Sequence, residues 1–400
     1  MRDDRPSAGR RQQLIGAPGP ATPGGYYGAV IRVLQLLTAT TLGGGPRQVF
    51  DLVRRLPADE FKVAVAGPRN QRFAADLRTL GIELGEVAVD TFRAFPLTLR
   101  AVERLVRDTR ADVVHTHGKG AGLYGRLAAW LVGVPAVHTF HGIHYESYSR
   151  AGQYLYLTLE RWLAGITHTV INVSRTQQNE ARRLGVARSG RSVVVVNGID
   201  VDELAARPVS GKAAFGLNAD DQVLGCVARF DPVKRHDVLL KALARVAQRN
   251  PNVVLLLAGE GPEKARIDQR AGELKVRVVN PGAIGWQTNP YSSCDLYVTA
   301  SSKEGLPLAP LEAMASGLAV IATEVPGHQD VVEPDATGLL VPPGDDAAMS
   351  VAIESLLNDP ERRRRMGQAG RERVRREFTV QSMVAKTAEV YRAANASRRS

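Results

Sequence analysis

Short apolar strand patterns alternate with amphipathic helical patterns along this chain, and this alternation constrains the fold more than any other feature. In the first half, strand patterns occur at 30–37, 61–66, 112–116, 136–140, 169–173 and 192–196. Helical periodicity separates several of them, at 46–56, 96–109 and 120–132. Strands that alternate with helices favour parallel pairing, with helices on both faces of the sheet. The pattern therefore predicts an α/β fold.

The same pattern starts again after 202–212, where the strand signal is lost. Strand patterns return at 223–229, 253–258, 276–279, 296–299 and 318–322, and a helix is expected at 237–249. Because 400 residues exceed one compact core, we predict two Rossmann-like domains facing across a cleft, at 30–205 and 206–378. A basic helix is expected at 359–376, broken near Gly367 and Gly370, followed by a terminal helix from 380 to about 396.

Residues 1–29 are predicted to form a disordered tail. They carry Asp3 and Asp4, lack the apolar region of a secretory signal, and continue into Pro/Gly/Ala-rich sequence. No apolar run in the chain approaches the roughly 18 residues of a membrane span. Cys226 and Cys294 lie in apolar strand-like segments, which favours buried free thiols in a reducing, cytoplasmic setting over a disulfide or zinc site.

Positive charge is concentrated in the first half of the chain. Residues 1–200 hold 26 Lys/Arg against 16 Asp/Glu, whereas residues 201–400 hold 26 against 25. A basic surface there could meet an anionic membrane leaflet, a diphosphate-linked acceptor or a nucleic acid, or could serve solubility alone. We expect no nucleic-acid partner, because the sequence has no zinc-finger spacing, RNP aromatics or basic heptad helix.

Two glutamates eight positions apart, Glu304 and Glu312, follow the strand pattern at 295–300. Gly305 and Pro307 interrupt the chain between them, and 308–315 is predicted as a helix. Ligands of open α/β sheets bind at this edge, where amides at a helix N-terminus suit a phosphate. A carboxylate beside a phosphate is unfavourable unless it binds hydroxyls, so we interpret both glutamates as acceptors for sugar hydroxyls. Two solvated acids are the simpler alternative.

Glycines and a histidine mark the ends of strands in the first half. Gly43, Gly44 and Gly45 follow the first strand, where they allow close approach of a ligand and aim amides at negative charge, although a tight turn would also explain them. His141, in Thr139-Phe140-His141-Gly142, is expected to point into the cleft. His115 and His117 end the preceding strand and are interpreted mainly as packing of the cleft wall; a metal site is not expected.

Two cations follow the first strand of the second half. Arg229 and Lys234 can stabilise the negative charge of a leaving nucleoside diphosphate without a metal ion. Gly259, in Gly259-Glu260-Gly261-Pro262, ends the next strand and is expected to lie near the nucleotide. Surface cations and a plain turn are the alternatives.

Taken in order, these elements resemble those of the retaining glycosyltransferases of family four, which have the GT-B fold. The resemblance rests on the E-x7-E pair, the T-x-H-G, G-R-x4-K and G-x-G-P elements, and segments similar to D-V-V-H-x-H and N-G-V-D. Ala228 stands where glycine is usual, and His328 and Asp330 replace the second glycine and the acid of a G-G-x-x-E element. The resemblance also implies that the terminal helix, 379–400, crosses back to the first domain.

The resemblance implies roles for the candidate residues. Glu304 would hold sugar hydroxyls and Glu312 ribose hydroxyls, while His141 would orient the donor sugar. Arg229 and Lys234 would hold the diphosphate. Backbone groups near the donor would come from Gly44, Gly45, Gly259, Gly305 and Leu306.

The implied function is metal-independent, cofactor-free transfer of a hexosyl unit from a nucleotide-sugar, a UDP- or GDP-sugar, with retention of configuration. The expected acceptor is a glycan or a polyprenyl-diphosphate-linked sugar, in cell-surface polysaccharide or glycolipid assembly at the inner face of the plasma membrane. Peripheral association with anionic membrane is expected there. Two alternatives stay open: a GT-B sugar-nucleotide epimerase, and a non-catalytic scaffold that binds sugar nucleotides.

Overall fold

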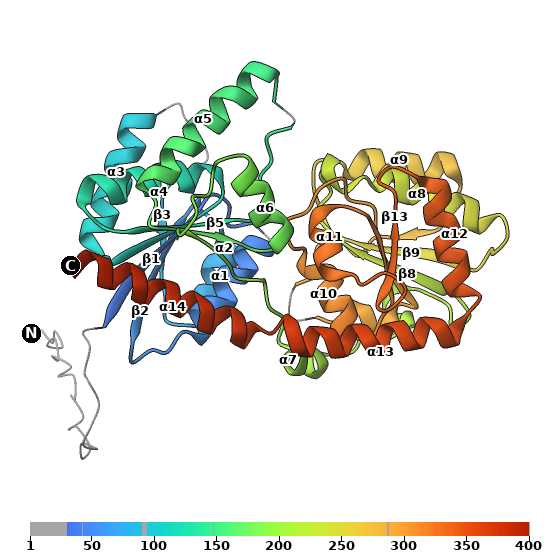
Figure 1. The fold of residues 1–400 in the computed structure, drawn as a ribbon. Helices are drawn as coiled ribbons and strands as arrows, with labels where there is room; N and C mark the ends of the chain where they lie inside the picture. Colours follow the sequence, from blue (N-terminus) through green and yellow to red (C-terminus); the bar gives the residue numbers. More distant parts are fainter. Residues whose placement is uncertain (1–29, 42, 90–93, 147, 286–287, 400) are drawn as a thin grey trace, which may run out of the picture.

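The structure, a computed structural model, describes residues 30–41, 43–89, 94–146, 148–285 and 288–399. The predicted disordered tail, 1–29, lies outside these residues. Two α/β units lie side by side, each built on one parallel sheet with helices packed on its two faces (Figure 1). The predicted fold class of two Rossmann-like units is confirmed.

The first unit contains a seven-stranded sheet in the order β3-β2-β1-β4-β5-β6-β7. Its strands are β1 (Ile31–Leu37), β2 (Phe61–Gly67), β3 (Leu84–Glu86), β4 (Val113–His117), β5 (Ala136–Phe140), β6 (Thr169–Asn172) and β7 (Ser192–Val194). Its helices are α1 (Gly44–Arg55), α2 (Gln71–Arg78), α3 (Phe95–Asp108), α4 (Lys119–Val132), α5 (Arg150–Ile166) and α6 (Arg175–Arg183), and α7 (Val201–Ala206) leads to the second unit. Six of these strands match the predicted ones to within two residues; the short edge strand β3 was not predicted.

The second unit contains a six-stranded sheet in the order β10-β9-β8-β11-β12-β13. Its strands are β8 (Gln222–Val227), β9 (Val253–Ala258), β10 (Val278–Val279), β11 (Leu296–Thr299), β12 (Val320–Thr323) and β13 (Gly338–Val341). Its helices are α8 (His236–Ala247), α9 (Lys264–Leu274), α10 (Leu308–Ala315), α11 (Pro326–Val331), α12 (Asp346–Leu357) and α13 (Pro360–Glu377). Short 3-10 turns occur at Lys212–Phe215, Pro232–Lys234 and Pro290–Ser293.

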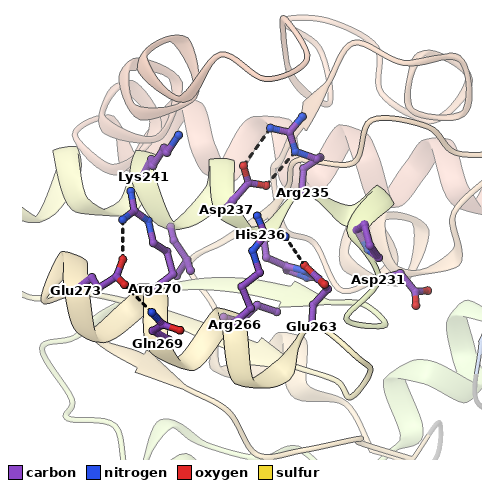
Figure 2. A pocket seen from close by; sticks show the side chains of 13 residues that line it. Asp231, Arg235, His236, Asp237, Lys241, Glu263, Arg266, Gln269, Arg270 and Glu273 are labelled. Carbon is purple, nitrogen blue, oxygen red and sulfur yellow. Dashed lines mark hydrogen bonds and ion pairs between the residues drawn. The ribbon is translucent and has the colours of Figure 1, made fainter. Parts of the chain in front are cut away.

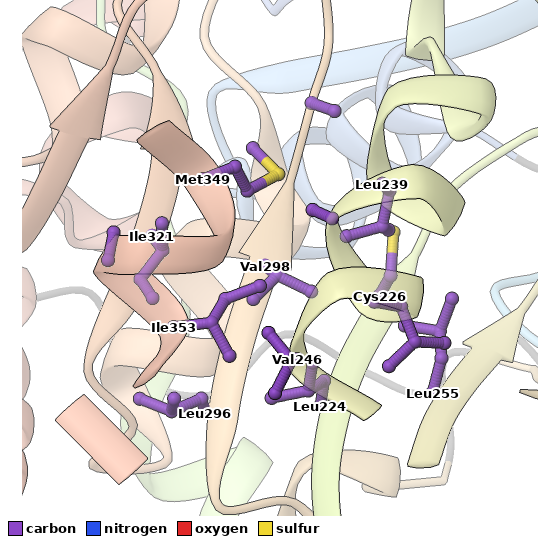
Figure 3. Packing of buried hydrophobic residues seen from close by; sticks show 14 of the residues in the cluster. Leu224, Cys226, Leu239, Val246, Leu255, Leu296, Val298, Ile321, Met349 and Ile353 are labelled. Carbon is purple, nitrogen blue, oxygen red and sulfur yellow. The ribbon is translucent and has the colours of Figure 1, made fainter. Parts of the chain in front are cut away.

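Continuous apolar strands explain why both sheets are covered on both faces. In β9 every residue is buried, as expected for a central parallel strand. Figure 3 shows one resulting core, in which Leu224, Val298 and Ile321 of the sheet pack against Leu239 of α8 and Ile353 of α12. Such a core fixes the strand positions, and therefore the loops at their ends.

The basic helix α13 is continuous, so the predicted break near Gly367 and Gly370 was wrong. Both glycines serve packing instead. A Cβ atom on Gly367 would lie 1.9 Å from the carbonyl oxygen of Gly317, and one on Gly370 would lie 3.3 Å from the Met314 side chain. Glycine is therefore needed here because α13 approaches α10 closely, and the helix tolerates its modest destabilising effect.

The last helix, α14 (Val380–Arg399), leaves α13 and lies beside the first sheet (Figure 1). Its buried residues, Val380, Met383, Val384, Ala388 and Tyr391 among them, join the core formed by β1, β4 and β5. The C-terminal helix of the chain therefore completes the hydrophobic core of the first unit.

Strand order places the candidate residues at the points where the two sheets change direction. In the first sheet, the order reverses between β1 and β4, and in the second between β8 and β11. Ligands of open α/β sheets bind beside the carboxyl ends of such strands, because the two adjacent loops diverge there. The loops that leave β1, β8 and β11 carry Gly43–Gly45, Arg229–Lys234 and Glu304–Leu306.

Candidate active site at the junction of the two units

Loops from both units meet at these switch points. A Cβ atom placed on Gly43 would lie 3.9 Å from the Arg229 side chain, and one on Gly44 would lie 3.8 Å from Leu308. On Gly45 it would lie 3.7 Å from the imidazole of His141. The glycine loop thus brings the first turn of α1 against residues of both units, and any larger side chain would fill the space beside His141.

Two helix N-termini with no side-chain cap lie close together here. α1 begins after Gly43 and α10 begins after Pro307, and neither preceding residue provides a side-chain hydrogen bond to the first turn. The first backbone N–H groups of a helix have no partner within the helix and carry partial positive charge. Since Gly44 and Leu308 are neighbours, the partial positive charges of both helix N-termini lie in one region, which favours an anion.

Lys234 and Glu304 form the central ion pair of the site. Lys234 Nζ lies 2.6 Å from Glu304 Oε1, and the Glu304 side chain is only 11% exposed. Lys234 ends a 3-10 turn after β8, and Glu304 lies on the loop after β11, so adjacent strands position the two groups. The predicted partners of diphosphate and sugar are thus in contact with each other.

Glu304 is held as a carboxylate by its surroundings. Burial by itself raises its pKa, but Lys234, His328 and a hydrogen bond from Ser301 together outweigh burial and lower the pKa below its ordinary value. His328 is fully buried, and its Nδ1 bonds to the carbonyl oxygen of Thr323 at 2.8 Å. His328, which stands where the family pattern has glycine, therefore helps to lower the pKa of Glu304.

Arg229 lies at the opening of this loop. Its guanidinium forms an ion pair with Asp231 at 2.5 Å, yet its side chain is 56% exposed. An exposed guanidinium with an acidic neighbour keeps its charge and can exchange that partner for a phosphate. Gly259 ends β9 beside the same loop, and its N–H donates to the carbonyl of Gly282 at 2.9 Å.

Glu312 lies in α10, where two side chains hold it. Tyr291 donates its hydroxyl to Glu312 Oε2 at 2.8 Å, and Arg207 lies 3.6 Å from Oε1. Sequence reasoning identified neither partner, since both are far from the E-x7-E element and carry no local motif. They orient the carboxylate and compensate its charge.

A chain of buried polar side chains lies behind His141. His141 Nε2 is 3.0 Å from His117 Nδ1, and His117 Nε2 is 2.9 Å from Gln35 Oε1. Gln35 Nε2 donates to the Tyr391 hydroxyl at 2.6 Å, which is also 2.6 Å from His115 Nδ1. His115 Nε2 then reaches Thr139 Oγ1 at 2.7 Å. His115 and His117, interpreted as packing, are therefore members of a hydrogen-bonded network.

The network defines which atom of His141 carries the proton. If Gln35 Oε1 accepts from His117 Nε2–H, then neutral His117 has only a lone pair at Nδ1. His141 must then donate from Nε2, which leaves its Nδ1 as an acceptor. Burial lowers the pKa of His141 to about 4 and, with His141 nearby, that of His115 to about 3. Both rings are therefore neutral near pH 7.

Further contacts hold the two units together at the site. A Cβ atom on Gly305 would lie 2.6 Å from the carbonyl oxygen of His141, so only glycine fits there. Asn197 donates to the carbonyl of buried Leu306 at 2.8 Å. Lys303 lies 3.1 Å from Glu180 and also pairs with Glu146, while Thr176 bonds to Asp330. The glycine loop and His141 of the first unit thus meet Arg229, Gly305 and Leu308 of the second.

A hollow of about 700 Å³ lies between α8 and α9, and its lining includes Asp231 and Pro232 of the loop that follows β8 (Figure 2). Its arginines are occupied by neighbouring acids: Arg235 pairs with Asp237, Arg266 with Glu263, and Arg270 with Glu273. Within the hollow, these three arginine charges are therefore compensated by neighbouring acids.

Among the described residues, no group of three or more His, Cys, Asp and Glu is arranged to hold a metal ion. Within the same residues, no helix combines the length and apolar character required to span a bilayer. Cys226 and Cys294 are both free thiols, the first buried and the second partly exposed.

Comparison with known proteins identifies relatives for both units. Residues 211–373 match the family "Glycosyl transferases group 1", and residues 42–203 match "Glycosyltransferase Family 4". The alpha-maltose-1-phosphate synthase of Mycolicibacterium smegmatis is 32% identical over 314 residues, covering 72% of this chain and 80% of that protein. The UDP-Gal:alpha-D-GlcNAc-diphosphoundecaprenol alpha-1,3-galactosyltransferase of Escherichia coli is 28% identical over 279 residues, covering 65% and 71% respectively.

Solved structures agree at the level of the fold. HepE of Anabaena, in complex with UDP and glucose, superposes with a TM-score of 0.80 at 20% identity, covering 91% of this chain and 100% of that chain. With the two parallel sheets, this similarity establishes the GT-B fold.

Proposed function

From the premise that the chain belongs to the GT-B glycosyltransferases of family 4 and group 1, we propose that it transfers a hexosyl unit from a UDP-sugar, or failing that a GDP-sugar, with retention of configuration and without a metal ion. The acceptor is a glycan or a polyprenyl-diphosphate-linked sugar in cell-surface polysaccharide or glycolipid assembly. The reaction takes place in the cytoplasm, at the inner face of the plasma membrane.

The observation that carries this proposal is the adjacent pair of uncapped helix N-termini, with Lys234 and Arg229 beside them. A diphosphate leaving group bears two negative charges, and it gains most from fixed donors and cations that need no rearrangement during the reaction. Amides of α1 and α10 and the two side chains supply both. These groups would replace a metal ion in stabilising the leaving group.

Donor binding rearranges the central ion pair. The diphosphate competes with Glu304 for Lys234, because Lys234 Nζ now lies 2.6 Å from the carboxylate. As Lys234 turns to the phosphate, both carboxylate oxygens become acceptors for sugar hydroxyls. The site therefore couples recognition of the diphosphate to recognition of the sugar.

His141 orients the donor sugar as a neutral imidazole. Its Nδ1 accepts a hydrogen bond from a sugar hydroxyl, while His117 holds Nε2. We assign no protein group as general base, since the leaving phosphate can take the acceptor's proton in a front-face reaction.

The assignment of the donor and acceptor draws support from the relatives. By its name, the E. coli protein uses UDP-Gal and a diphosphoundecaprenol-linked acceptor, and the Anabaena structure contains UDP. The excess of positive charge in residues 1–200 suits an acceptor with a diphosphate at an anionic membrane.

Thermal unfolding with UDP-, GDP- and ADP-sugars in the presence of EDTA tests the donor assignment. A ligand at a hundredfold excess over its Kd stabilises the folded chain by about 2.7 kcal/mol. We expect a rise in Tm with one UDP-sugar, followed by product formation once a lipid-diphosphate acceptor is added. Binding without turnover over all acceptors would favour a scaffold, and conversion of the donor sugar without acceptor would favour an epimerase. Binding that requires a divalent cation would contradict metal independence.

A further inference from the structure

A group of large apolar side chains is exposed on one face of the first unit, formed by α5 and the end of α4. The group consists of Trp130, Leu131, Tyr154, Leu155 and Trp162, and their exposed fractions are 55%, 50%, 73%, 71% and 49%. We call it the α4–α5 face. Half of the ten large hydrophobic residues that are exposed within the described ranges lie on this face. The indole rings of Trp130 and Trp162 are in contact, with centroids 6.3 Å apart, so the two helices present one continuous surface.

The exposed residues of α5 lie on a single side of the helix. At 100° per residue, Tyr154, Leu155 and Trp162 fall within about 100° of its circumference. Leu163 and Ala164 are buried on another side. Figure 1 shows α5 projecting from the first unit, where no other described element covers its outer side. A helix with apolar residues on its outward side as well as its inward side indicates an interaction surface rather than an ordinary solvated one.

Positive charge lies along one edge of this face and is in excess in the sequence that forms α5 and α6. Residues 150–191 contain seven arginines and no other cation except histidine, against two glutamates. Both glutamates are neutralised within the fold, Glu160 by Arg126 at 2.8 Å and Glu180 by Lys303 at 3.1 Å. Arg150 and Arg161 lie along the edge of the apolar side of α5, and both are exposed. Among the described residues, neither forms an ion pair, so their charge is available to an external partner.

The N-terminal end of α5 lies near the candidate active site. The loop that leaves His141 runs directly into α5, which begins at Arg150. Lys119, at the start of α4, donates to the Tyr148 hydroxyl at 2.8 Å and lies 4.9 Å from the Tyr156 ring centroid. The start of α5 is therefore fixed near the carboxyl edge of the first sheet, where His141 lies. A surface that contacts the start of α5 would therefore also lie near the site.

We propose that the α4–α5 face docks on an anionic lipid bilayer. This assignment rests on the proposed function and deepens it, because it identifies the surface that faces the membrane of the lipid-linked acceptor. Tryptophan and tyrosine favour the interface of a membrane, leucine enters its apolar layer, and arginine pairs with lipid phosphates; the face provides all three. A second copy of this chain is a poorer partner, because two faces with uncompensated arginines would repel each other.

Co-sedimentation of the full chain with vesicles tests this assignment. Two compositions are compared at low salt: phosphatidylcholine alone, and phosphatidylcholine mixed with phosphatidylglycerol. We expect binding to the mixed vesicles and a shift of tryptophan emission to shorter wavelength, since two of the three tryptophans lie on the face. The double variant Leu155→Ser/Trp162→Ser should bind at least about tenfold more weakly. Equal binding of the two proteins, or no preference for the anionic vesicles, would overturn the proposal.

A matched control removes apolar surface elsewhere. Val209 and Val351 are 68% and 63% exposed outside the α4–α5 face, so the variant Val209→Ser/Val351→Ser should bind vesicles like the unmodified chain. Both double variants should keep the Tm rise with the nucleotide-sugar. If the nucleotide-sugar does not raise the Tm of the unmodified chain, the proposed donor is wrong, but the docking surface is not affected by that result. A dimer that the Leu155→Ser/Trp162→Ser variant abolishes, without vesicle binding by either protein, would assign the face to a second copy and overturn the proposal.

Discussion

Single residues at the junction are held by partners that come from other strands and helices. Lys234 and Glu304 occupy neighbouring loops, and His328 lies beneath Glu304 although the family pattern has glycine at its position. His141 bonds to His117, and it lies so close to Gly45 that a Cβ atom there would be 3.7 Å from its ring. The charge of Glu304 and the neutrality of His141 therefore depend on the side chains that surround them, and not on Glu304 or His141 alone.

The substitution Glu304→Gln tests the role of the carboxylate charge. The amide keeps the shape of the side chain but can no longer accept two charge-assisted hydrogen bonds from a sugar. Such bonds contribute about 1.5–3 kcal/mol, so kcat/KM for transfer should fall about 10- to 100-fold. Steady-state kinetics and the Tm of the variant measure activity and folding separately.

The control is Glu324→Gln, which changes an exposed glutamate at the end of β12 and should leave kcat/KM unchanged. Near-normal transfer by Glu304→Gln would remove Glu304 from the site.

At the scale of elements, α14 contributes a polar side chain to the network behind His141 in addition to its apolar packing against the first sheet. Tyr391 extends from α14 to Gln35 of β1 and His115 of β4, and its hydroxyl links these two residues in the middle of the network behind His141. Burial raises the pKa of Tyr391 well above its ordinary value, so the hydroxyl keeps its proton and can donate it to His115. The helix thereby positions a catalytic-site histidine from the far end of the sequence.

The variant Tyr391→Phe should destabilise the first unit by about 1–3 kcal/mol, because it leaves buried Gln35 and His115 with unpaired polar atoms. Urea unfolding followed by circular dichroism measures this loss. Tyr154→Phe removes an exposed hydroxyl from α5 and serves as the control, with a change expected to be close to zero. Equal unfolding midpoints for the two variants would show that the network does not stabilise the fold.

At the scale of the whole molecule, burial of neutral histidines links stability to pH. Burial lowers the pKa of His115 to about 3, and burial together with Lys234 lowers that of His236 to about 4, against the opposing effect of Asp237. In the unfolded chain these groups bind protons below about pH 6.5, whereas in the folded chain they do not. The free energy of unfolding must therefore decrease as the pH falls from about 6.5 towards 4.

Each such histidine contributes up to about 1.4 kcal/mol per pH unit within that window. Urea midpoints should be lower at pH 5 than at pH 7. The variant His236→Gln removes one titrating group and should show a smaller difference between the two pH values. A difference that stays the same in this variant would mean that His236 is not the neutral, buried group described above.

Much of the fold and several site residues could be predicted from the sequence, since they depend on local patterns. Strands such as 136–140 and 253–258 were predicted with the same ends as β5 and β9, because unbroken apolar runs define a buried parallel strand. The helix at 308–315 was also predicted correctly. A histidine or a glutamate followed by glycine just after a strand placed His141 and Glu304 at the sheet edge.

By itself, then, the sequence determined two parallel sheets and the strand ends that carry His141, Lys234 and Glu304. Only the tertiary structure decided which side chains meet: Tyr391 with Gln35, Arg207 with Glu312, and Lys303 with Glu180. It also decided that Gly367 serves helix packing and does not break α13. The physical reason is that strand and helix patterns act over a few residues, whereas these contacts join positions up to 356 residues apart, and their geometry exists only after the sheets have formed.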